Sequence, residues 1–321
     1  MDQRIPTRSI SFPTHDEALK NKKSNLWNQL ERITVREAIT LWLGTLNGLT
    51  QDSYTKWMNR LIEMGLINPE MNLQTFSLVN QNVIIDKIKL VKEWAETTRQ
   101  SRAACLISFT NFLDRRTGGI VKRAVPSREG VNRTFFKVHD EVVTEALNQS
   151  QWMTFLEELE IINHRDCLIA KTILQGAKRK SEVLELKLNQ INWKTKEISF
   201  KQKKTGGRKQ ITIITYPGEF MGQLLAYLEN RVRGLVFVTK IGTKVHPTQI
   251  QRTFYQAGER AGVPFKVTPH VLRATTITYL KQQGFSDTDI MKVSGHQDSA
   301  MIRMYDKSDK AQNASKKVSL F

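Results

Sequence analysis

The chain has 321 residues, of which 40% are hydrophobic and 25% are charged, and its formal net charge is +18. This composition excludes a disordered polymer and is typical of a globular protein that is long enough for two domains. Residues 1–130 carry a net charge of +6 and residues 131–321 carry +12, so both halves favour a polyanionic partner such as nucleic acid.

Other classes of protein are excluded by what the sequence lacks. It contains no apolar run of about 18 residues, so no membrane-spanning helix is predicted. The first residues have no apolar signal-peptide core, and residues 1–30 are predicted to form an arm that is disordered or docks on a partner. The two cysteines, Cys105 and Cys167, are too few for a disulfide framework or a cysteine-rich metal cluster, which favours a reducing cytoplasm.

Residues 31–120 are predicted to form a helical domain. Apolar side chains recur at helical spacing, as with Trp57, Leu61 and Met64, and Gly65 is placed to end that helix. Four helices are expected, at residues 35–46, 50–65, 82–95 and 97–113. A linker is predicted at residues 121–144, where proline, serine and glycine interrupt the helical periodicity and charges cluster.

Residues 145–321 are predicted to form a second domain of mixed structure. Thr268 followed by Pro269, and Ser286 followed by Asp289, are typical helix starts. A Gly-Gly pair between two alternating segments predicts a hairpin. Helices are expected at 147–163, 166–176, 217–232 and 248–261, then from 268, from 286 to about 295 and from 299; strands are expected at 188–193, 196–202 and 209–215, with a strand-like run at 236–240. The predicted fold class is therefore mainly α with a small antiparallel sheet (α+β).

The last 55 residues carry the most informative pattern. His270 and Arg273 form an H-x-x-R motif, His296 follows in S-G-H-Q, and Tyr305 comes nine residues later. Two imidazoles, a guanidinium and a phenol are groups that can hold a phosphate and attack it through the phenolic oxygen.

The order of these residues resembles the tyrosine recombinase, or phage integrase, family. The family's upstream R-x-S-E motif is matched by Arg179 to Glu182, and its hairpin lysine is matched best by Lys204 in K-T-G. The resemblance covers residues 146–321 and fills all six catalytic positions in order. The context is similar to Xer-like recombinases and, more closely, to plasmid-encoded virulence-plasmid integrases.

The resemblance implies a reaction at a DNA phosphodiester. Tyr305 would form a 3′-phosphotyrosyl link, while Arg179 and Arg273 would hold the non-bridging oxygens of the phosphate. Lys204 would be the general acid for the departing 5′-oxygen, although neighbouring lysines on the same hairpin could take that role or simply contact DNA. No metal, cofactor or ATP is implied, because two arginines can supply the charge and the phosphotyrosine conserves the bond energy.

The resemblance also assigns supporting roles. His270 would contact the phosphate or accept the tyrosine proton, His296 would hydrogen-bond a non-bridging oxygen, and Glu182 would support an active-site arginine or histidine or lie on the surface. One departure is the glycine, which stands three residues before Arg179 where the family usually has two. We expect this departure to alter local geometry and not the role of Arg179.

The helical domain resembles the family's core-binding domain, which closes with the catalytic domain as a C-shaped clamp around DNA. Each of its basic residues could instead be a solvated helix face. The candidate DNA contacts are Lys56, Arg60, Arg99 and Arg102 in this domain, and Lys178, Lys180 and Lys203 in the catalytic domain.

Three functions remain open from the sequence. The first is a site-specific recombinase that acts on double-stranded DNA, as a homotetramer or as a hetero-tetramer with a sister recombinase. The second is a type IB topoisomerase, and the third is a catalytically silent DNA-binding regulator of a plasmid. The target site, the outcome of recombination and any accessory partner cannot be deduced from sequence.

Overall fold

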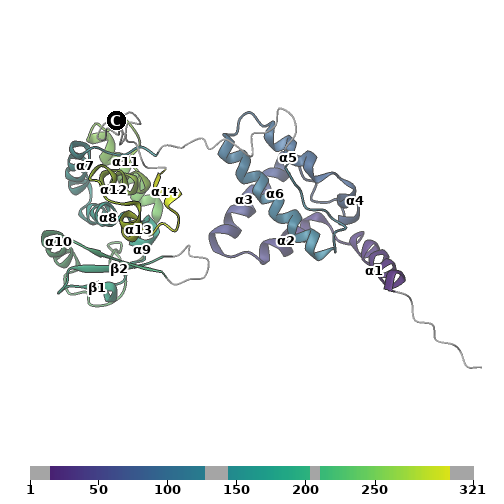
Figure 1. Ribbon diagram of the computed structural model, residues 1–321, viewed down its shortest axis with the longest axis horizontal. Helices are drawn as coiled ribbons and strands as arrows, with labels where there is room; N and C mark the ends of the chain where they lie inside the picture. The colour runs from purple at the N-terminus through teal and green to yellow at the C-terminus, as the bar shows by residue number, and fades with distance from the viewer. Residues whose placement is uncertain (1–14, 127–143, 203–209, 304–321) are drawn as a thin grey trace, which may run out of the picture. The chain divides into compact units, whose positions relative to one another are not determined.

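The computed structural model describes residues 15–126, 144–202 and 210–303, and the chain divides into two compact units, Met1–Asp140 and Glu141–Phe321 (Figure 1). The segments that contain Lys203, Lys204 and Tyr305 lie outside the described residues. We call Met1–Asp140 the helical unit and Glu141–Phe321 the catalytic unit.

The helical unit is built around its longest helix, α6, which packs against α3 and α5 (Figure 1). Phe109 of α6 is fully buried and contacts the rings of Trp42 and Phe76, so aromatic side chains from three helices meet in one core. The described helices are α1 (His15–Leu30), α2 (Val35–Gly44), α3 (Gly48–Glu63), α4 (Leu73–Leu78), α5 (Gln81–Lys89) and α6 (Glu96–Arg116).

Two of these helices were not predicted. Residues 15–30 were assigned to the N-terminal arm, whereas the structure has helix α1 there. Its composition is polar, so helical periodicity is weak in the sequence, and it packs against α4. Helix α4 has only six residues, which is too short for a periodic pattern, but Asn72 caps it by accepting a hydrogen bond from the amide of Thr75.

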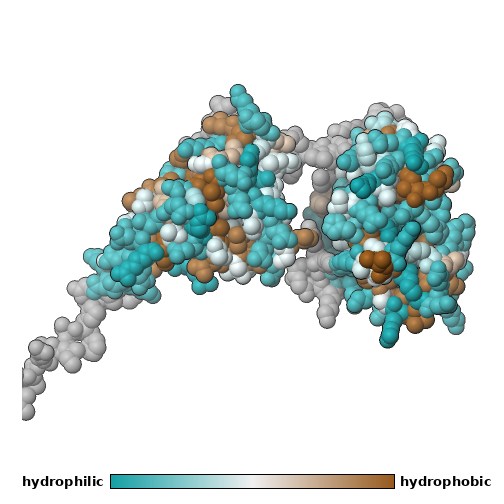
Figure 2. Space-filling model, turned by 180° about the vertical axis from the view of Figure 1, so that it is seen from behind, coloured by the Kyte–Doolittle hydropathy of each residue, from teal (hydrophilic) through white to brown (hydrophobic). Residues whose placement is uncertain are grey.

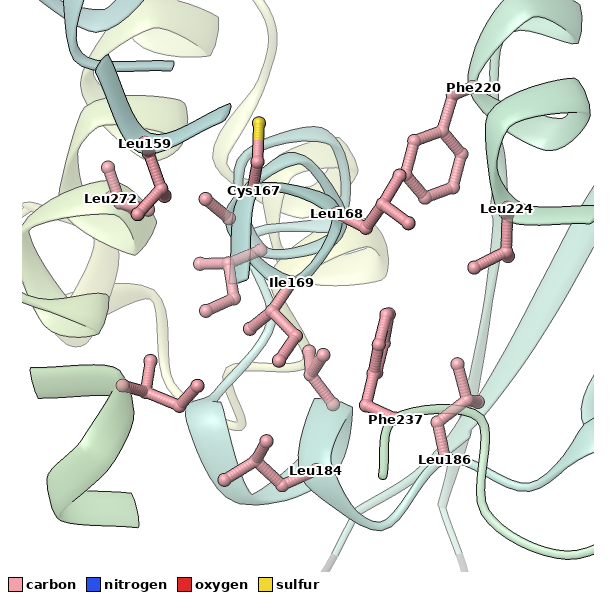
Figure 3. Packing of buried hydrophobic residues seen from close by; sticks show 14 of the residues in the cluster. Leu159, Cys167, Leu168, Ile169, Leu184, Leu186, Phe220, Leu224, Phe237 and Leu272 are labelled. Atoms are coloured by element: carbon pink, nitrogen blue, oxygen red, sulfur yellow. The ribbon is translucent and has the colours of Figure 1, made fainter. Parts of the chain in front are cut away.

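The catalytic unit packs several helices around α8, which is buried on most of its surface. Leu168, Ile169 and Ile173 are fully buried, and α8 contacts α7, α10 and α12. Figure 3 shows Leu168 and Ile169 among other buried apolar side chains, such as Leu159 and Phe220. Its described helices are α7 (Gln149–Ile162), α8 (His164–Gly176), α9 (Lys180–Leu184), η2 (Leu188–Gln190), α10 (Gly218–Leu228), α11 (Pro247–Arg260), α12 (Pro269–Gln282), α13 (Asp287–Ser294) and α14 (Ser299–Arg303).

The sheet has three antiparallel strands in the order β1 (Ile191–Asn192), β2 (Glu197–Lys201) and β3 (Ile211–Thr215). Ile198 pairs with Ile214 and Phe200 with Thr212, and all four face the core, while the residues between them are more exposed. The two strands lie where the segments on either side of the Gly-Gly pair predicted them. The strands β2 and β3 flank the segment that contains Lys204.

The predicted fold class is confirmed: the chain is mostly helical with a small antiparallel sheet. The prediction of a strand-like run at residues 236–240 was wrong. Val236 and Phe237 are buried but belong to a loop, in which the amide of Val236 donates to the carbonyl of Leu186. Among the described residues, the stretch and the residue before it form isolated bridges and no strand: Leu235 pairs with Lys187 and Val238 with Lys244. The helix expected to reach residue 232 ends at Leu228.

The surface that Figure 2 draws is mostly hydrophilic on each unit, with apolar side chains in scattered groups. Across the described ranges, none of the helices is both long enough and apolar enough to cross a membrane.

Candidate active site

Arg273 is the more buried of the two candidate catalytic arginines. It lies on α12, which starts as predicted with Thr268 as N-cap and Pro269 in the first turn. The side chain is only 2% exposed. Its Nη1 donates to the carbonyl of Ala177 at 2.5 Å, and its Nη2 lies 2.9 Å from His296 Nε2. Two neighbours that are remote in sequence therefore fix the plane of this guanidinium before any ligand binds.

His296 follows α13, which Gly295 ends in a left-handed conformation. Its Nδ1 lies 2.8 Å from Ser294 Oγ. Because a guanidinium can only donate, Nε2 accepts from Arg273 and the ring proton is assigned to Nδ1, which donates to Ser294. Burial, together with the nearby charges of Arg273 and Arg179, lowers the pKa of His296 to about 3. The imidazole is therefore neutral at physiological pH.

Arg179 is held by a carboxylate. It is the N-cap residue of α9, and its Nη1 lies 2.8 Å from Glu182 Oε1, while Glu182 Oε2 accepts the Arg179 amide at 3.0 Å. The Glu182 side chain is 2% exposed and the Arg179 side chain 34%. A buried carboxylate thus orients an arginine whose other N–H groups remain open to a ligand. Of the two roles open for Glu182, support of an arginine fits this geometry and a surface position does not.

His270 lies in the first turn of α12, three residues before Arg273 and on the same side of the helix. Partial desolvation lowers its pKa, and Arg273 and Arg179 lower it further. His270 in turn contributes to the lowered pKa of His296. These four side chains are therefore within electrostatic reach of one another, although they come from the start of α9, from α12 and from the turn after α13.

The arrangement suits an anion. Two arginines that protein partners orient converge beside two histidines with lowered pKa values, so a phosphate placed among them would find guanidinium donors already oriented. Among the described residues, no group of three or more histidine, cysteine, aspartate or glutamate side chains could hold a metal ion.

The structure corrects the expectation for Lys178. This residue was a candidate DNA contact, but its side chain is fully buried, so it is not available to a phosphate backbone. Its Nζ donates to Thr212 Oγ1 and to the Val293 carbonyl. Nothing in the local sequence distinguishes it from the lysine two residues later. Lys180 is half-buried, with its Nζ 3.4 Å from the carbonyl of Pro247.

The displaced glycine before Arg179 has a packing explanation. Ala177, not Gly176, is the left-handed residue that ends α8, with φ of 47° and ψ of 37°. A Cβ on Gly176 would lie 3.0 Å from the Lys178 side chain and 3.0 Å from the Tyr216 hydroxyl. The glycine is therefore required by the close approach of Lys178, while Ala177 carries the positive φ that a glycine would adopt without strain.

The candidate cations of the helical unit lie on α3 and α6. Lys56 and Arg60 are exposed, and Arg60 pairs with Glu63 at 3.1 Å. Arg99 donates to the carbonyl of Lys89 at 2.9 Å. Arg102 stacks over the rings of Trp57 and Trp94 at 5.0 and 5.6 Å. Each of these three guanidinium groups therefore has a contact within the helical unit, whereas Lys56 is exposed on α3.

Comparison with known proteins identifies the family. Residues 145–312 match the model of the phage integrase family. Over 324 residues the chain is 47% identical to the virulence plasmid integrase pGP8-D of Chlamydia muridarum (strain MoPn / Nigg), covering 100% of this chain and 98% of that relative. The chain belongs to the phage integrase family. Its members are the tyrosine recombinases, so the resemblance stated from the motifs is confirmed.

Two further relatives agree. The virulence plasmid integrase pGP7-D of Chlamydia trachomatis is 36% identical over 82% of this chain and 87% of its own length. The XerH site-specific recombinase, in a post-cleavage complex with palindromic difH substrate, shares the fold with a TM-score of 0.65 at 14% identity, over 82% of this chain and 77% of that chain. The integrase is a site-specific DNA recombinase, a strand-transferring enzyme, and the topoisomerase and silent-regulator alternatives are not favoured.

Proposed function

We propose that the integrase cleaves and rejoins DNA through Tyr305, with the phosphate held by Arg179 and Arg273 beside His270 and His296. The observation that carries this proposal is the pre-formed pair of Arg273, fixed by Ala177 and His296, and Arg179, fixed by Glu182. Negative charge builds on the non-bridging oxygens in the transition state, and donors that need no reorganisation stabilise it most.

The proposed step is an in-line transesterification. The phenolic oxygen of Tyr305 forms a bond to phosphorus, the bond to the 5′-oxygen breaks, and the phenolic proton passes to His270 or solvent. Lys204 gives a proton to the departing 5′-oxygen, which leaves a free 5′-hydroxyl and a 3′-phosphotyrosyl link. The lowered pKa of His270 supports its role as the acceptor, because a neutral imidazole can take a proton.

The biological setting is also a proposal. The relatives are virulence plasmid integrases, which supports action in plasmid maintenance or DNA integration. We propose a tetramer on two duplexes, either of identical chains or with a sister recombinase. Both cysteines, Cys105 and Cys167, are buried free thiols, which agrees with a reducing cytoplasm.

The deciding experiment traps the covalent intermediate. A nicked suicide substrate made from the replicon that encodes the integrase is incubated with the wild type, with Tyr305→Phe and with Tyr279→Phe as a matched control on α12. An SDS-stable adduct with the wild type and Tyr279→Phe, but not with Tyr305→Phe, is expected. An adduct that persists in Tyr305→Phe would assign another nucleophile, and bound DNA with no adduct would favour a silent regulator. On an unnicked substrate, product DNA in which each strand is rejoined to its original partner and only the topology has changed would indicate topoisomerase-like rejoining.

A further inference from the structure

Lys178 is a buried cation that the mechanism described so far does not use. It follows Ala177 and precedes Arg179, and its side chain is fully buried. Its Nζ donates to Thr212 Oγ1 at 2.5 Å and to the carbonyl of Val293 at 2.6 Å, and it lies 5.2 Å from the centre of the Phe200 ring. A buried charge is costly unless its partners are well placed, so these contacts call for an explanation.

The partners of Lys178 belong to two elements that flank the site. Phe200 and Thr212 are opposite each other on β2 and β3, the strands that flank the segment containing Lys204. Val293 is the penultimate residue of α13, three residues before His296. One ammonium therefore ties the base of the hairpin to the end of the helix that positions His296.

Other contacts bring the same two elements together. Helix α13 packs against β3. A Cβ on Gly295 would overlap with the side-chain amide of Gln202, the last described residue before the gap, and the side chains of Gln210 and Gln297 are hydrogen-bonded. We call this contact, made by Gln202, Gln210 and Thr212 on one side and by residues 293–297 on the other, the hairpin–turn contact. Lys178 is the charged group at its buried end.

We propose that Lys178 is a positioning residue for strand transfer: its ammonium holds the base of the β2–β3 hairpin against the turn that carries His296. This inference rests on the proposed function, because it assigns Lys178 the task of keeping the hairpin lysine and the phosphate-binding groups in one register. A displacement of about 1 Å between such groups can slow catalysis about a hundredfold.

Protonation of Lys178 makes this contact sensitive to pH. The ionisable groups that face it are Glu182, Arg179, Arg273 and His296. The pKa of Lys178 is lowered to about 7: burial is the largest cause, Arg273 and Arg179 lower it too, and Glu182 opposes them. The contact is thus held by an ammonium below about pH 7 and by a weaker, neutral donor above it. A bound phosphate would offset the two arginines and favour the charged form.

The test measures single-turnover cleavage of the nicked suicide substrate by the full-length integrase. Lys178→Met is expected to cleave at least about tenfold more slowly at about pH 6.5, with DNA affinity within about threefold of the wild type. The ratio of the wild-type rate to the Lys178→Met rate should fall as the pH rises. Lys171→Met is the matched control, because Lys171 is a half-buried lysine on α8 whose Nζ donates to Gln223, away from this contact.

A second set of variants keeps the proposal testable if Lys178→Met folds poorly. Thr212→Val removes one partner and should slow cleavage severalfold, Thr212→Ser should restore it, and Thr212→Val should add no further loss in a Lys178→Met background. Equal rates for Lys178→Met and the wild type at every pH would overturn the proposal. So would independent, additive losses from Lys178 and Thr212.

Amide hydrogen exchange separates this inference from the proposed function. The amide of Gln202, which donates to Gln210, and that of Gly295, which donates to Met291, should exchange faster in Lys178→Met than in the wild type, while amides of α8 should not change. If the wild type forms no adduct, the proposed function fails, and unchanged exchange at Gln202 and Gly295 would then also reject the role of Lys178.

Discussion

The candidate DNA-contacting cations on α3 of the helical unit are exposed, whereas Arg273 and Lys178 of the catalytic unit are enclosed. Lys56 and Arg60 are exposed, and the Arg60–Glu63 pair has both side chains more than half exposed. In contrast, Arg273 and Lys178 are almost inaccessible and have partners up to 115 residues away in sequence. Surface cations supply salt-dependent affinity without fixed geometry, while enclosed cations supply geometry that persists in high salt.

The strongest test of this contrast is Arg273→Lys. A lysine keeps the charge but cannot reach the Ala177 carbonyl, His296 and a phosphate together, because an ammonium lacks the planar fork of donors. We expect the rate of adduct formation to fall about a thousandfold, with DNA affinity nearly unchanged. A loss of affinity equal to the loss of rate would show that Arg273 acts mainly in binding.

The glycine beside Lys178 tests the packing that encloses the catalytic cations. Gly176→Ala forces a methyl group to within 3.0 Å of Lys178 and Tyr216, so the free energy of unfolding should fall by about 1–3 kcal/mol. Ala177→Gly should change it by less than about 1 kcal/mol. Relief of the left-handed strain there is offset by the lost buried methyl group and by the greater freedom of glycine in the unfolded chain. Urea unfolding of both variants measures the contrast, and a larger effect of Ala177→Gly would contradict it.

Glu182→Gln tests whether the more exposed arginine also needs a fixed partner. The amide cannot accept from Arg179 with the strength of a carboxylate, so we expect cleavage to slow about tenfold or more. Glu185→Gln is the control, because that carboxylate pairs with Lys244 at 3.0 Å on the surface. Equal effects of the two variants in a single-turnover assay would argue against a special role for the Arg179–Glu182 pair.

The pH dependence of stability tests the burial of Lys178 independently of catalysis. Its pKa is about 7 in the folded chain and ordinarily 10.5, so between these values the unfolded chain binds more protons. The folded state therefore gains stability as pH rises through that window. The Tm of the wild type minus that of Lys178→Met should increase by several degrees from pH about 7 to about 10. A flat difference would mean that the lysine is solvated.

The smallest effect is expected on the helical unit. Lys56→Ala should weaken DNA binding severalfold and reduce the slope of log affinity against log salt by about 0.9, if Lys56 contacts one phosphate. Cleavage of bound DNA should not change. Titrations at several salt concentrations measure this, with Lys20→Ala as an exposed control on α1. An unchanged slope would identify Lys56 as a solvated helix face.

Local signals explain what could be predicted of the fold. The starts of α12 and α13 were found because the N-cap side chains Thr268 and Ser286 accept from amides in the first turn, and Pro269 fixes the backbone there. The hairpin was found because two strand-like segments flank a Gly-Gly pair, which is a local turn signal. Helices α1 and α4 were missed because one is polar and the other has six residues, so neither gives an amphipathic pattern.

The sequence by itself determined the family, the mainly helical class and the spacing that brings His270 and Arg273 to one side of a helix, because these depend on residue types at short separation. Only the tertiary structure decided which of the adjacent basic residues Lys178, Arg179 and Lys180 is enclosed. It also decided that the Ala177 carbonyl and His296 fix Arg273. These contacts join segments far apart in the chain, and burial there is set by the surrounding helices and sheet, not by local sequence.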